Sequence, residues 1–218
     1  MVSVNVATPS RLGVRHGRVV RSAIAKTPVP GDSLWLDWIN LRGDRQGDMR
    51  VHGGQDKAVY CYASEHWDDW SAELGRPCGP ASFGENLSLA GVLEAQVCIG
   101  DVWRWGDAVV QVAQPRYPCF KLAMHTGVPD VEARLVAAGR TGWYLRVLRP
   151  GEVPTRGGIS VEDRDAARLS VLDAHRAFTS DQPRDLARIP ALLALGALAE
   201  SWKRMLRRRL AVMENRAS

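Results

Sequence analysis

The sequence lacks the patterns that identify several common classes of protein. Its four cysteines, Cys61, Cys78, Cys98 and Cys119, contain no CxxC pair, which argues against a structural zinc site. The glycine-rich fingerprints of P-loop and dinucleotide-binding proteins are absent. No paired carboxylates and no Ser-His-Asp order stand out. The sequence therefore gives no support to a zinc-finger, nucleotide-binding or triad-hydrolase class.

Targeting and membrane-spanning patterns are also missing. Residues 1–6 show no charged region leading into an apolar one, which argues against a signal peptide. No apolar run is long enough to span a bilayer. Together with the widely spaced cysteines, these absences predict a cytoplasmic protein with reduced thiols and no membrane partner.

The overall composition is that of a globular protein with ample core material. The chain has 218 residues, of which 45% are hydrophobic, and a net charge of +5. Basic residues cluster near the C-terminus at Lys203, Arg204 and 207–209. A net positive charge suggests nucleic acid as a binding partner. These residues are spaced as one solvated helix face, so we do not favour that partner.

The order of predicted elements divides the chain into two parts. Residues 1–153 are rich in strand patterns, with short β-prone runs at 18–24, 34–39, 58–62, 102–105, 108–112 and 143–148. Gly106-Asp107 predicts a tight hairpin turn. Helices are expected at 64–74 and 129–138, each followed by glycine. This pattern predicts a mostly β fold, an antiparallel barrel or sandwich with a few helices.

Residues 154–218 have a different character and predict a small α-helical C-terminal appendage. After the loop at 154–158, Ser160 and Asp163 resemble a capping box that would begin a helix. Residues 191–213 are rich in Leu, Ala and Arg, which favour helix. We expect two or three short helices in this part.

The segment 114–122 carries the strongest chemical signal. Cys119 follows Pro118 and stands between two cationic residues, Arg116 and Lys121. Proline stiffens the backbone, and nearby cations stabilise a thiolate, the form of cysteine that binds metal. A soft thiolate beside a guanidinium suits an anionic, metal-containing cofactor. The alternative is a buried, inert cysteine in a core turn.

Three further segments contain candidate ligand-binding residues. His52 and Lys57 flank the Gly53-Gly54 pair, whose N–H groups could form an anion-binding concavity; a polar hairpin tip is the alternative. Asn86 could face a ligand or bond its own backbone in a turn. Arg140 lies between two glycines and could grip phosphate with two hydrogen bonds; the alternative is a helix-to-strand loop.

An ordered set of motifs resembles the MOSC family, proteins similar to the C-terminal domain of molybdenum cofactor sulfurase. The resemblance is to the bacterial YiiM-like branch, which carries a helical C-terminal appendage, and it covers about residues 4 to 153. The motifs that carry it are Gly43-Asp44, the run 52–59 (HGGQDKAV), the run 83–87 (FGENL), Ile99-Gly100-Asp101, the run 114–122 (QPRYPCFKL) and the run 139–144 (GRTGWY).

The resemblance implies a MOSC-type β-barrel that binds a molybdenum cofactor (molybdopterin), with Cys119 as a thiolate ligand to molybdenum. It also implies reduction of N-hydroxylated compounds, such as hydroxylaminopurine base analogues, with electrons from a separate flavoprotein reductase. The chain itself has no flavin, haem or iron–sulfur motif. Lys57, Arg116 and Arg140, then His52 and Asn86, are the candidates for holding the cofactor.

Several points stay open from the sequence. His52 is the candidate proton donor, because imidazole titrates near neutrality. The helical appendage could form a homodimer contact, a reductase docking surface or a lid. A carrier of cofactor or sulfur, using a persulfide on Cys119, would share the same cysteine and anion site. A nucleic-acid-binding module based on the basic C-terminal residues would leave the cysteine and glycine motifs unexplained.

Overall fold

A computed structural model describes residues 1–45 and 54–217. Twelve strands lie within these residues: β1 Ser3–Val6, β2 Ser10–Arg15, β3 Arg18–Ser22, β4 Thr27–Pro28, β5 Ser33–Leu36, β6 Val59–Ala63, β7 Leu87–Leu89, β8 Val102–Trp105, β9 Ala108–Pro115, β10 Trp143–Arg149, β11 Gly151–Pro154 and β12 Ser160–Asp163. The helices are α1 Trp67–Leu74, α2 Lys121–Thr126, α3 Val131–Ala138, α4 Val171–Thr179, α5 Pro183–Leu186, α6 Ile189–Ala194 and α7 Glu200–Ala217, with 3-10 turns η1 Gln55–Lys57 and η2 Ser64–His66.

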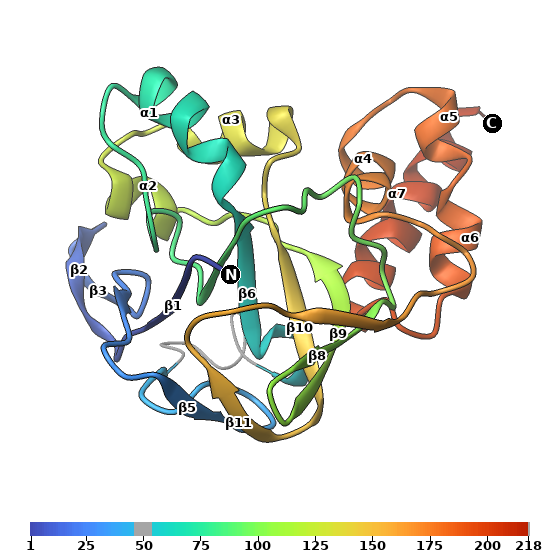
Figure 1. Cartoon of the computed structure of the whole chain (residues 1–218). Coiled ribbons are helices and arrows are strands. Elements are labelled where there is room, and N and C mark those ends of the chain that lie inside the picture. Colours follow the sequence, from blue (N-terminus) through green and yellow to red (C-terminus); the bar gives the residue numbers. More distant parts are fainter. Residues whose placement is uncertain (46–53, 218) are drawn as a thin grey trace.

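One curled sheet organises the fold (Figure 1). Its eight strands run in the order β12-β8-β9-β10-β6-β7-β1-β4, and their pairing is antiparallel except between β6 and β7. The pairs β5–β11 and β2–β3 form two small separate sheets. The predicted hairpin at Gly106-Asp107 is confirmed, since it joins β8 to β9. The strand-rich, barrel-like fold predicted from the sequence is therefore correct.

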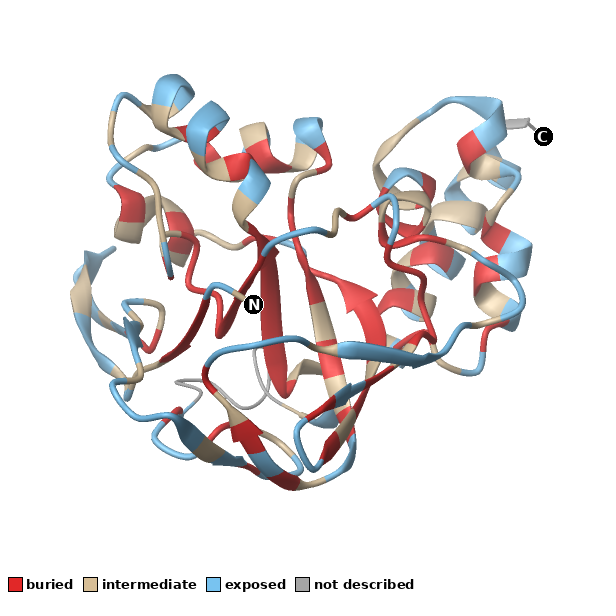
Figure 2. Cartoon of the chain, viewed as in Figure 1, coloured by how far each residue is buried: buried red, intermediate tan, exposed pale blue. Residues whose placement is uncertain are grey.

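The core lies along the central strands and under the helices. Every residue of β6 is buried, and Figure 2 shows this strand as continuous red beside β10, which pairs in turn with β9. A second apolar cluster under α1, α2 and α3 contains Tyr62, Trp70, Phe83, Leu122 and Leu135. Strand β6 contributes side chains to both clusters, so the two cores are joined through it. The loops that follow β6 and β9 therefore start from a rigid, buried base.

The helix ends follow from local sequence. Gly75 and Gly139 both have positive φ and close α1 and α3, as expected for a glycine just past a helix. Both predicted helices are present, with α1 preceded by η2 and α3 beginning at Val131. None of the helices in the described ranges is both long and apolar enough to cross a membrane.

The C-terminal helices are present, but the first of them begins later than expected. Ser160–Asp163 is not a helix start: it is the exposed strand β12, which pairs with β8. The capping box is at Ser170 and Asp173, where both reciprocal bonds form at the start of α4. The spacing Ser-x-x-Asp occurs at both places, but only Ser170 is followed by helically spaced residues that become buried, Val171, Ala174 and Ala177.

Four helices, rather than two or three, make up this region, and α7 alone has 18 residues. They lie together beside β9 (Figure 1, orange to red). Strand β12 lies beyond the predicted boundary at 153/154 and still belongs to the main sheet. The division into 1–153 and 154–218 remains a prediction.

Candidate functional site

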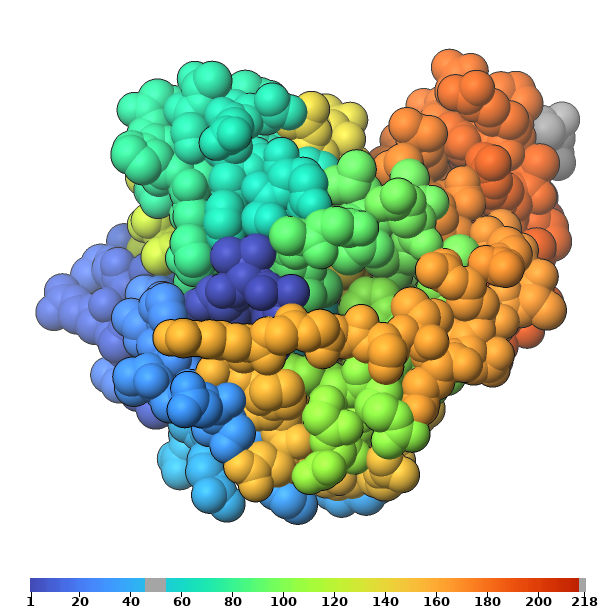
Figure 3. Space-filling model, in the orientation of Figure 1, coloured from blue at the N-terminus to red at the C-terminus, as the bar shows by residue number. Residues whose placement is uncertain are grey.

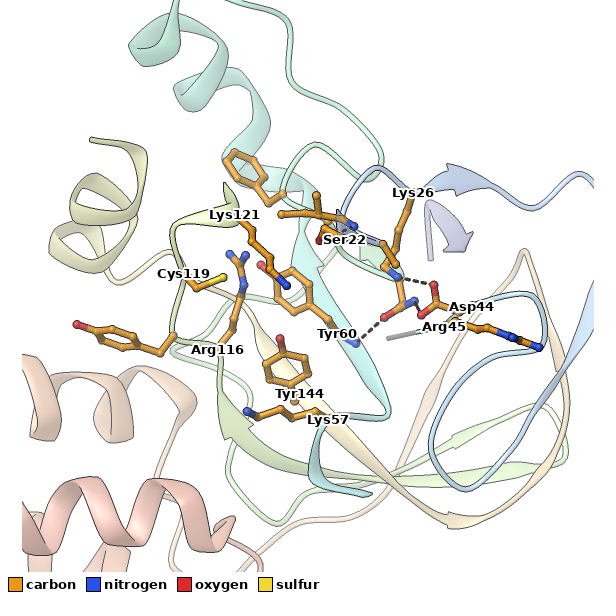
Figure 4. A pocket seen from close by; sticks show the side chains of 16 residues that line it. Ser22, Lys26, Asp44, Arg45, Lys57, Tyr60, Arg116, Cys119, Lys121 and Tyr144 are labelled. Carbon is orange, nitrogen blue, oxygen red and sulfur yellow. Dashed lines mark hydrogen bonds and ion pairs between the residues drawn. The ribbon is translucent and has the colours of Figure 1, made fainter. Parts of the chain in front are cut away.

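A cavity beside the loop between β9 and α2 brings several of the predicted residues together (Figure 4). Lys57, Asn86, Arg116 and Cys119 all line it, although they come from three separate segments of the chain. The other lining residues are Ser22, Ala23, Ile24, Lys26, Asp44, Arg45, Tyr60, Phe83, Gly84, Tyr117, Lys121 and Tyr144. The cavity therefore combines cationic side chains, aromatic rings and one thiol.

Cys119 lies on the wall of this cavity just before α2. Its side chain is partly buried, and its carbonyl accepts a hydrogen bond from the Leu122 N–H (2.8 Å), which begins the helical turn. In Figure 4 its sulfur points toward the Arg116 guanidinium. The two cations that flank Cys119 in the sequence, Arg116 and Lys121, both face the same cavity. Cys119 therefore shares its wall of the cavity with two cationic side chains.

Arg116 is a buried cation. Only 5% of the residue is exposed, its Cζ lies 4.7 Å from the centroid of the Tyr60 ring, and its Nη1 has no hydrogen-bond partner. No carboxylate of the described residues lies within ion-pair distance of it. Burying a charge without a counter-charge is unfavourable. The arrangement is typical of a site that receives an anion from outside the chain.

Burial also shifts the pKa values of the ionisable side chains around Arg116. Burial lowers the pKa of Lys57, against the influence of the neighbouring Asp56 carboxylate and Cys119, which raise it. Burial also raises the pKa of Tyr60 and Tyr144, although Arg116 opposes the shift in both. The two phenols therefore stay neutral, and the positive charge of the cavity is not cancelled by them.

Asn86 shapes the wall of the cavity through a network that uses both ends of its amide. Its Oδ1 accepts from the Tyr60 N–H (3.1 Å), and its Nδ2 donates to the Asn5 carbonyl (3.2 Å) and to Asp44 Oδ2 (2.8 Å). Asp44 in turn forms an ion pair with Lys26 (2.5 Å). Burial lowers the pKa of Lys26, and Asp44 opposes that shift. Asn86 thus ties three segments of the wall together.

Two of the predicted residues are not part of this constellation. Arg140 does not line the cavity: its Nη1 lies 2.9 Å from Asp69 Oδ2 and 3.7 Å from Glu73 Oε1, and its Cζ is 5.7 Å from the Trp70 ring centroid. It connects the loop after α3 to α1. His52 lies outside the described residues. A cofactor-binding role for these two side chains remains a prediction from the sequence.

The sequence did not reveal the aromatic part of the cavity. Tyr60 lies in a short apolar run and Tyr144 in a strand pattern, so the sequence indicates only sheet positions for both. Lys26 carries no motif. The one sequence signal that could have separated Tyr144 from the core is strand alternation, because neighbouring residues of a strand face opposite sides of the sheet. In β10 buried and intermediate positions do alternate, and Tyr144 faces the other side from Trp143.

The helical appendage reaches the cysteine loop through three aromatic rings. Tyr117 packs edge-on against Phe178 of α4, with ring centroids 5.6 Å apart, and Phe178 packs against Trp202 of α7 at 5.8 Å. Tyr117 lines the cavity and also a second groove between α3 and α4. In Figure 3 a notch separates the helices of the barrel from the C-terminal helices. The appendage therefore supports the loop that carries Arg116 and Cys119.

Gly142 fixes the backbone behind Arg116. Its carbonyl accepts from the Arg116 N–H (3.0 Å), and its N–H donates to Glu94 Oε1 (2.9 Å), a carboxylate that also contacts His66 Nε2 (2.8 Å). Its φ is +71°, and a Cβ built on it would lie 2.2 Å from the Cys61 carbonyl oxygen. Only glycine fits both this conformation and this close approach.

Replacing Gly142 by alanine is therefore expected to destabilise the protein strongly, by about 3 kcal/mol or more, because backbone strain and a backbone clash act together. Gly75 is a matched control: its φ is +63°, and a Cβ added to it would have nothing within 4 Å. Gly75→Ala should cost only about 1 kcal/mol. Thermal unfolding of both variants measures the difference, and equal losses would contradict the close-approach argument.

Among the residues that the structure describes, no three His, Cys, Asp or Glu side chains gather as a metal-binding set. A metal at this site would have to arrive with most of its ligands already in place. Cys119 is the one soft ligand on the cavity wall within the described ranges. The site is thus suited to a group that is itself anionic and carries its own metal ligands.

Comparison with known proteins identifies the family. A family model described as the MOSC domain matches residues 48–164, more than half of the chain. The chain belongs to the MOSC family. The resemblance seen in the sequence motifs is confirmed, and a second model, described as the YiiM-like 3-alpha helix domain, matches residues 170–212. The MOSC match contains Arg116 and Cys119, and the second match covers the start of α4 through most of α7.

Relatives share both parts of this MOSC protein. The uncharacterized protein YflK of Bacillus subtilis (strain 168) is 40% identical over 203 residues, which are 93% of this chain and 90% of YflK. The crystal structure of YiiM from Geobacillus stearothermophilus superposes with a TM-score of 0.79 at 33% identity, covering 96% of this chain and 97% of that one. A protein of Gibberella moniliformis (strain M3125 / FGSC 7600) named Reductase is 35% identical over 179 residues, 76% of this chain but 31% of that protein.

Proposed function

We propose that this MOSC protein is a molybdenum-cofactor-dependent reductase of N-hydroxylated compounds, with hydroxylaminopurine base analogues as the substrate class and a separate flavoprotein as electron donor. The observation that carries the proposal is the pairing of Cys119 with the buried, uncompensated Arg116 in one cavity. The fungal relative named Reductase, which aligns with three quarters of the chain, supports an oxidoreductase activity.

The residues of the cavity fit the chemistry of the cofactor. Molybdopterin is anionic through its phosphate, and Arg116, Lys57 and Lys121 give the cavity an excess of positive charge. The orphaned Nη1 of Arg116 retains donor capacity for such an anion. The rings of Tyr60 and Tyr144, whose centroids are 5.3 Å apart, add flat apolar surface beside the guanidinium. Cys119 adds the thiolate that soft or high-valent metals prefer.

Each residue group then has a distinct task. When bound, the cofactor supplies a two-electron redox centre. Arg116, with Lys57 and Lys121, binds and orients its anionic part, and Cys119 ligates the metal. Asn86 and Asp44 hold the opposite wall in place through their hydrogen bond. The net reaction consumes two electrons and two protons, breaks the N–O bond, and yields the amine and water.

Two groups are candidates to supply the protons. His52 is the donor assigned from the sequence, and it lies outside the described residues. Lys57 lines the cavity, and burial lowers its pKa, so it releases a proton more readily than an exposed lysine.

The test is direct. The protein is expressed in cells that make the cofactor, its molybdenum content is measured, and it is assayed with a hydroxylaminopurine and dithionite-reduced methyl viologen. We expect near-stoichiometric molybdenum and formation of the aminopurine. Bound molybdenum without turnover would favour a cofactor carrier, and no molybdenum from cofactor-competent cells would refute the proposal.

A further inference from the structure

The N-terminal end of this protein carries a net positive charge, as does helix α7. Residues 1–31 contain five cationic residues and no Asp or Glu, and the net charge of the whole chain is +5. Residues 32–218 are therefore neutral as a whole, because Asp and Glu elsewhere offset the positive charge of α7. The five residues are Arg11, Arg15, Arg18, Arg21 and Lys26. Lys26 is paired with Asp44, which leaves four arginines, all on the hairpin formed by β2 and β3.

The hairpin places like charges opposite each other. Arg15 pairs with Arg18 across the two strands, and Arg11 pairs with Arg21. All four residues are exposed, and none of them has a carboxylate of the described residues within ion-pair distance. Like charges directly opposite on a sheet are destabilising. Arg21 donates a hydrogen bond to the Pro9 carbonyl (2.9 Å) and Arg15 lies over the Phe120 ring, but neither contact supplies a counter-charge. The cluster therefore points to an external anionic surface.

The hairpin lies next to the cavity. The Arg15 guanidinium carbon lies 4.2 Å from the ring centroid of Phe120, the residue that follows Cys119. A Cβ on Gly13 would lie 2.9 Å from the Met124 side chain of α2, so β2 packs tightly on that helix. Ser22, the last residue of β3, and Ala23 and Ile24 after it lie on the cavity wall. A partner seated on the hairpin is therefore held close to the loop of Cys119.

The exposed surface of the hairpin is not purely charged. Val14 and Val19 are a cross-strand pair next to the Arg15–Arg18 pair, and they are 52% and 57% exposed. Aliphatic side chains together with arginine are typical of protein interfaces, whereas nucleic-acid backbones are bound through charged and polar groups. Figures 1 and 3 show the hairpin projecting at the left edge, on the opposite side from α7.

We propose that the β2–β3 hairpin is the docking surface for an acidic, flavin-carrying electron-donor protein. This inference rests on the proposed reductase function and assigns the surface through which its electrons arrive. Complementary charge steers association and raises its rate by about 10- to 1,000-fold at low ionic strength. A small patch of this kind suits the brief encounters of electron-transfer proteins.

The test compares two electron sources on the cofactor-loaded protein. Reduced flavodoxin, a small acidic FMN protein, is the protein donor, and dithionite-reduced methyl viologen is the small donor. The variant is the double substitution Arg11→Glu/Arg18→Glu, which leaves the cavity residues untouched. The matched control is Arg204→Glu/Arg208→Glu on α7, which makes the same charge change at exposed positions on the other side of the molecule.

We expect the hairpin variant to lose at least about 10-fold in kcat/KM for flavodoxin at low salt and to keep its methyl viologen rate. The control should keep both rates. Salt should slow the wild type with flavodoxin and have little effect on the hairpin variant. Loss of both rates in the hairpin variant, loss of neither, or a flavodoxin rate no higher than that of FMN alone would overturn the proposal.

Two other outcomes would also overturn it, each in a recognisable way. If the wild type has no activity with methyl viologen, the reductase function itself fails and the docking role falls with it. If the hairpin variant keeps its flavodoxin rate but loses salt-sensitive binding of a single-stranded oligonucleotide, the hairpin is a nucleic-acid surface.

Discussion

Replacing Cys119 by serine is expected to lower reductase activity by at least about 1,000-fold and to remove most of the bound molybdenum. Loss of a group that only orients a metal ligand typically costs about 10- to 100-fold, so loss of the ligand itself should cost more. Serine is close to cysteine in size but offers no soft thiolate. Molybdenum per protein and the methyl viologen-driven rate are the two measurements.

The fold should survive this substitution. Cys119 is only partly buried, and the hydrogen bond that starts α2 is accepted by its backbone carbonyl. Cys78 provides the matched control, because it is also partly buried and does not line the cavity. Cys78→Ser should keep both metal and activity. Full activity in Cys119→Ser would exclude the ligand assignment, and lost activity with unchanged molybdenum would make Cys119 a reacting group instead.

Replacing Arg116 by methionine is expected to separate stability from cofactor binding. The buried guanidinium has no carboxylate partner among the described residues, so removing its charge should leave the apo-protein as stable as before or more stable. The same change removes the main anion-binding group, and the retained molybdenum should fall at least about 10-fold. The melting temperature is measured on protein from cells that lack the cofactor, because bound ligand would add its own stabilisation.

Arg140→Met distinguishes the sequence-based assignment from the geometry. The sequence gives Arg140 the same cofactor-binding role as Arg116, which predicts the same loss of molybdenum. In the structure its partners are Asp69, Glu73 and the Trp70 ring, which predicts retained molybdenum with a small loss of stability. For the Arg116→Met variant of the preceding test, an unchanged molybdenum content would contradict the assignment of Arg116 as the main group that binds the anionic part of the cofactor.

Local features of the sequence were sufficient to predict much of the fold. Helix ends at Gly75 and Gly139 and the turn at Gly106 depend on backbone conformations that glycine adopts within a few residues. The error at Ser160 has the same origin. A capping pattern fits there locally, but the edge of β8 was available for pairing, and strand pairing depends on a partner more than 50 residues away.

The sequence alone determined the family, the strand-rich fold and the helical appendage, and it singled out Cys119 as the leading candidate residue, because motifs in a fixed order and short-range backbone rules carry that information. It also placed Lys57, Arg116 and Asn86 as candidates, and the structure brings them to one cavity with Cys119. Only the tertiary structure decided that Tyr60, Tyr144 and Lys26 share that cavity, that Arg140 faces α1, and that the arginine hairpin lies beside the cysteine loop. These relations join residues far apart in the chain, and burial, charge compensation and contact are properties of the packed fold rather than of any single segment.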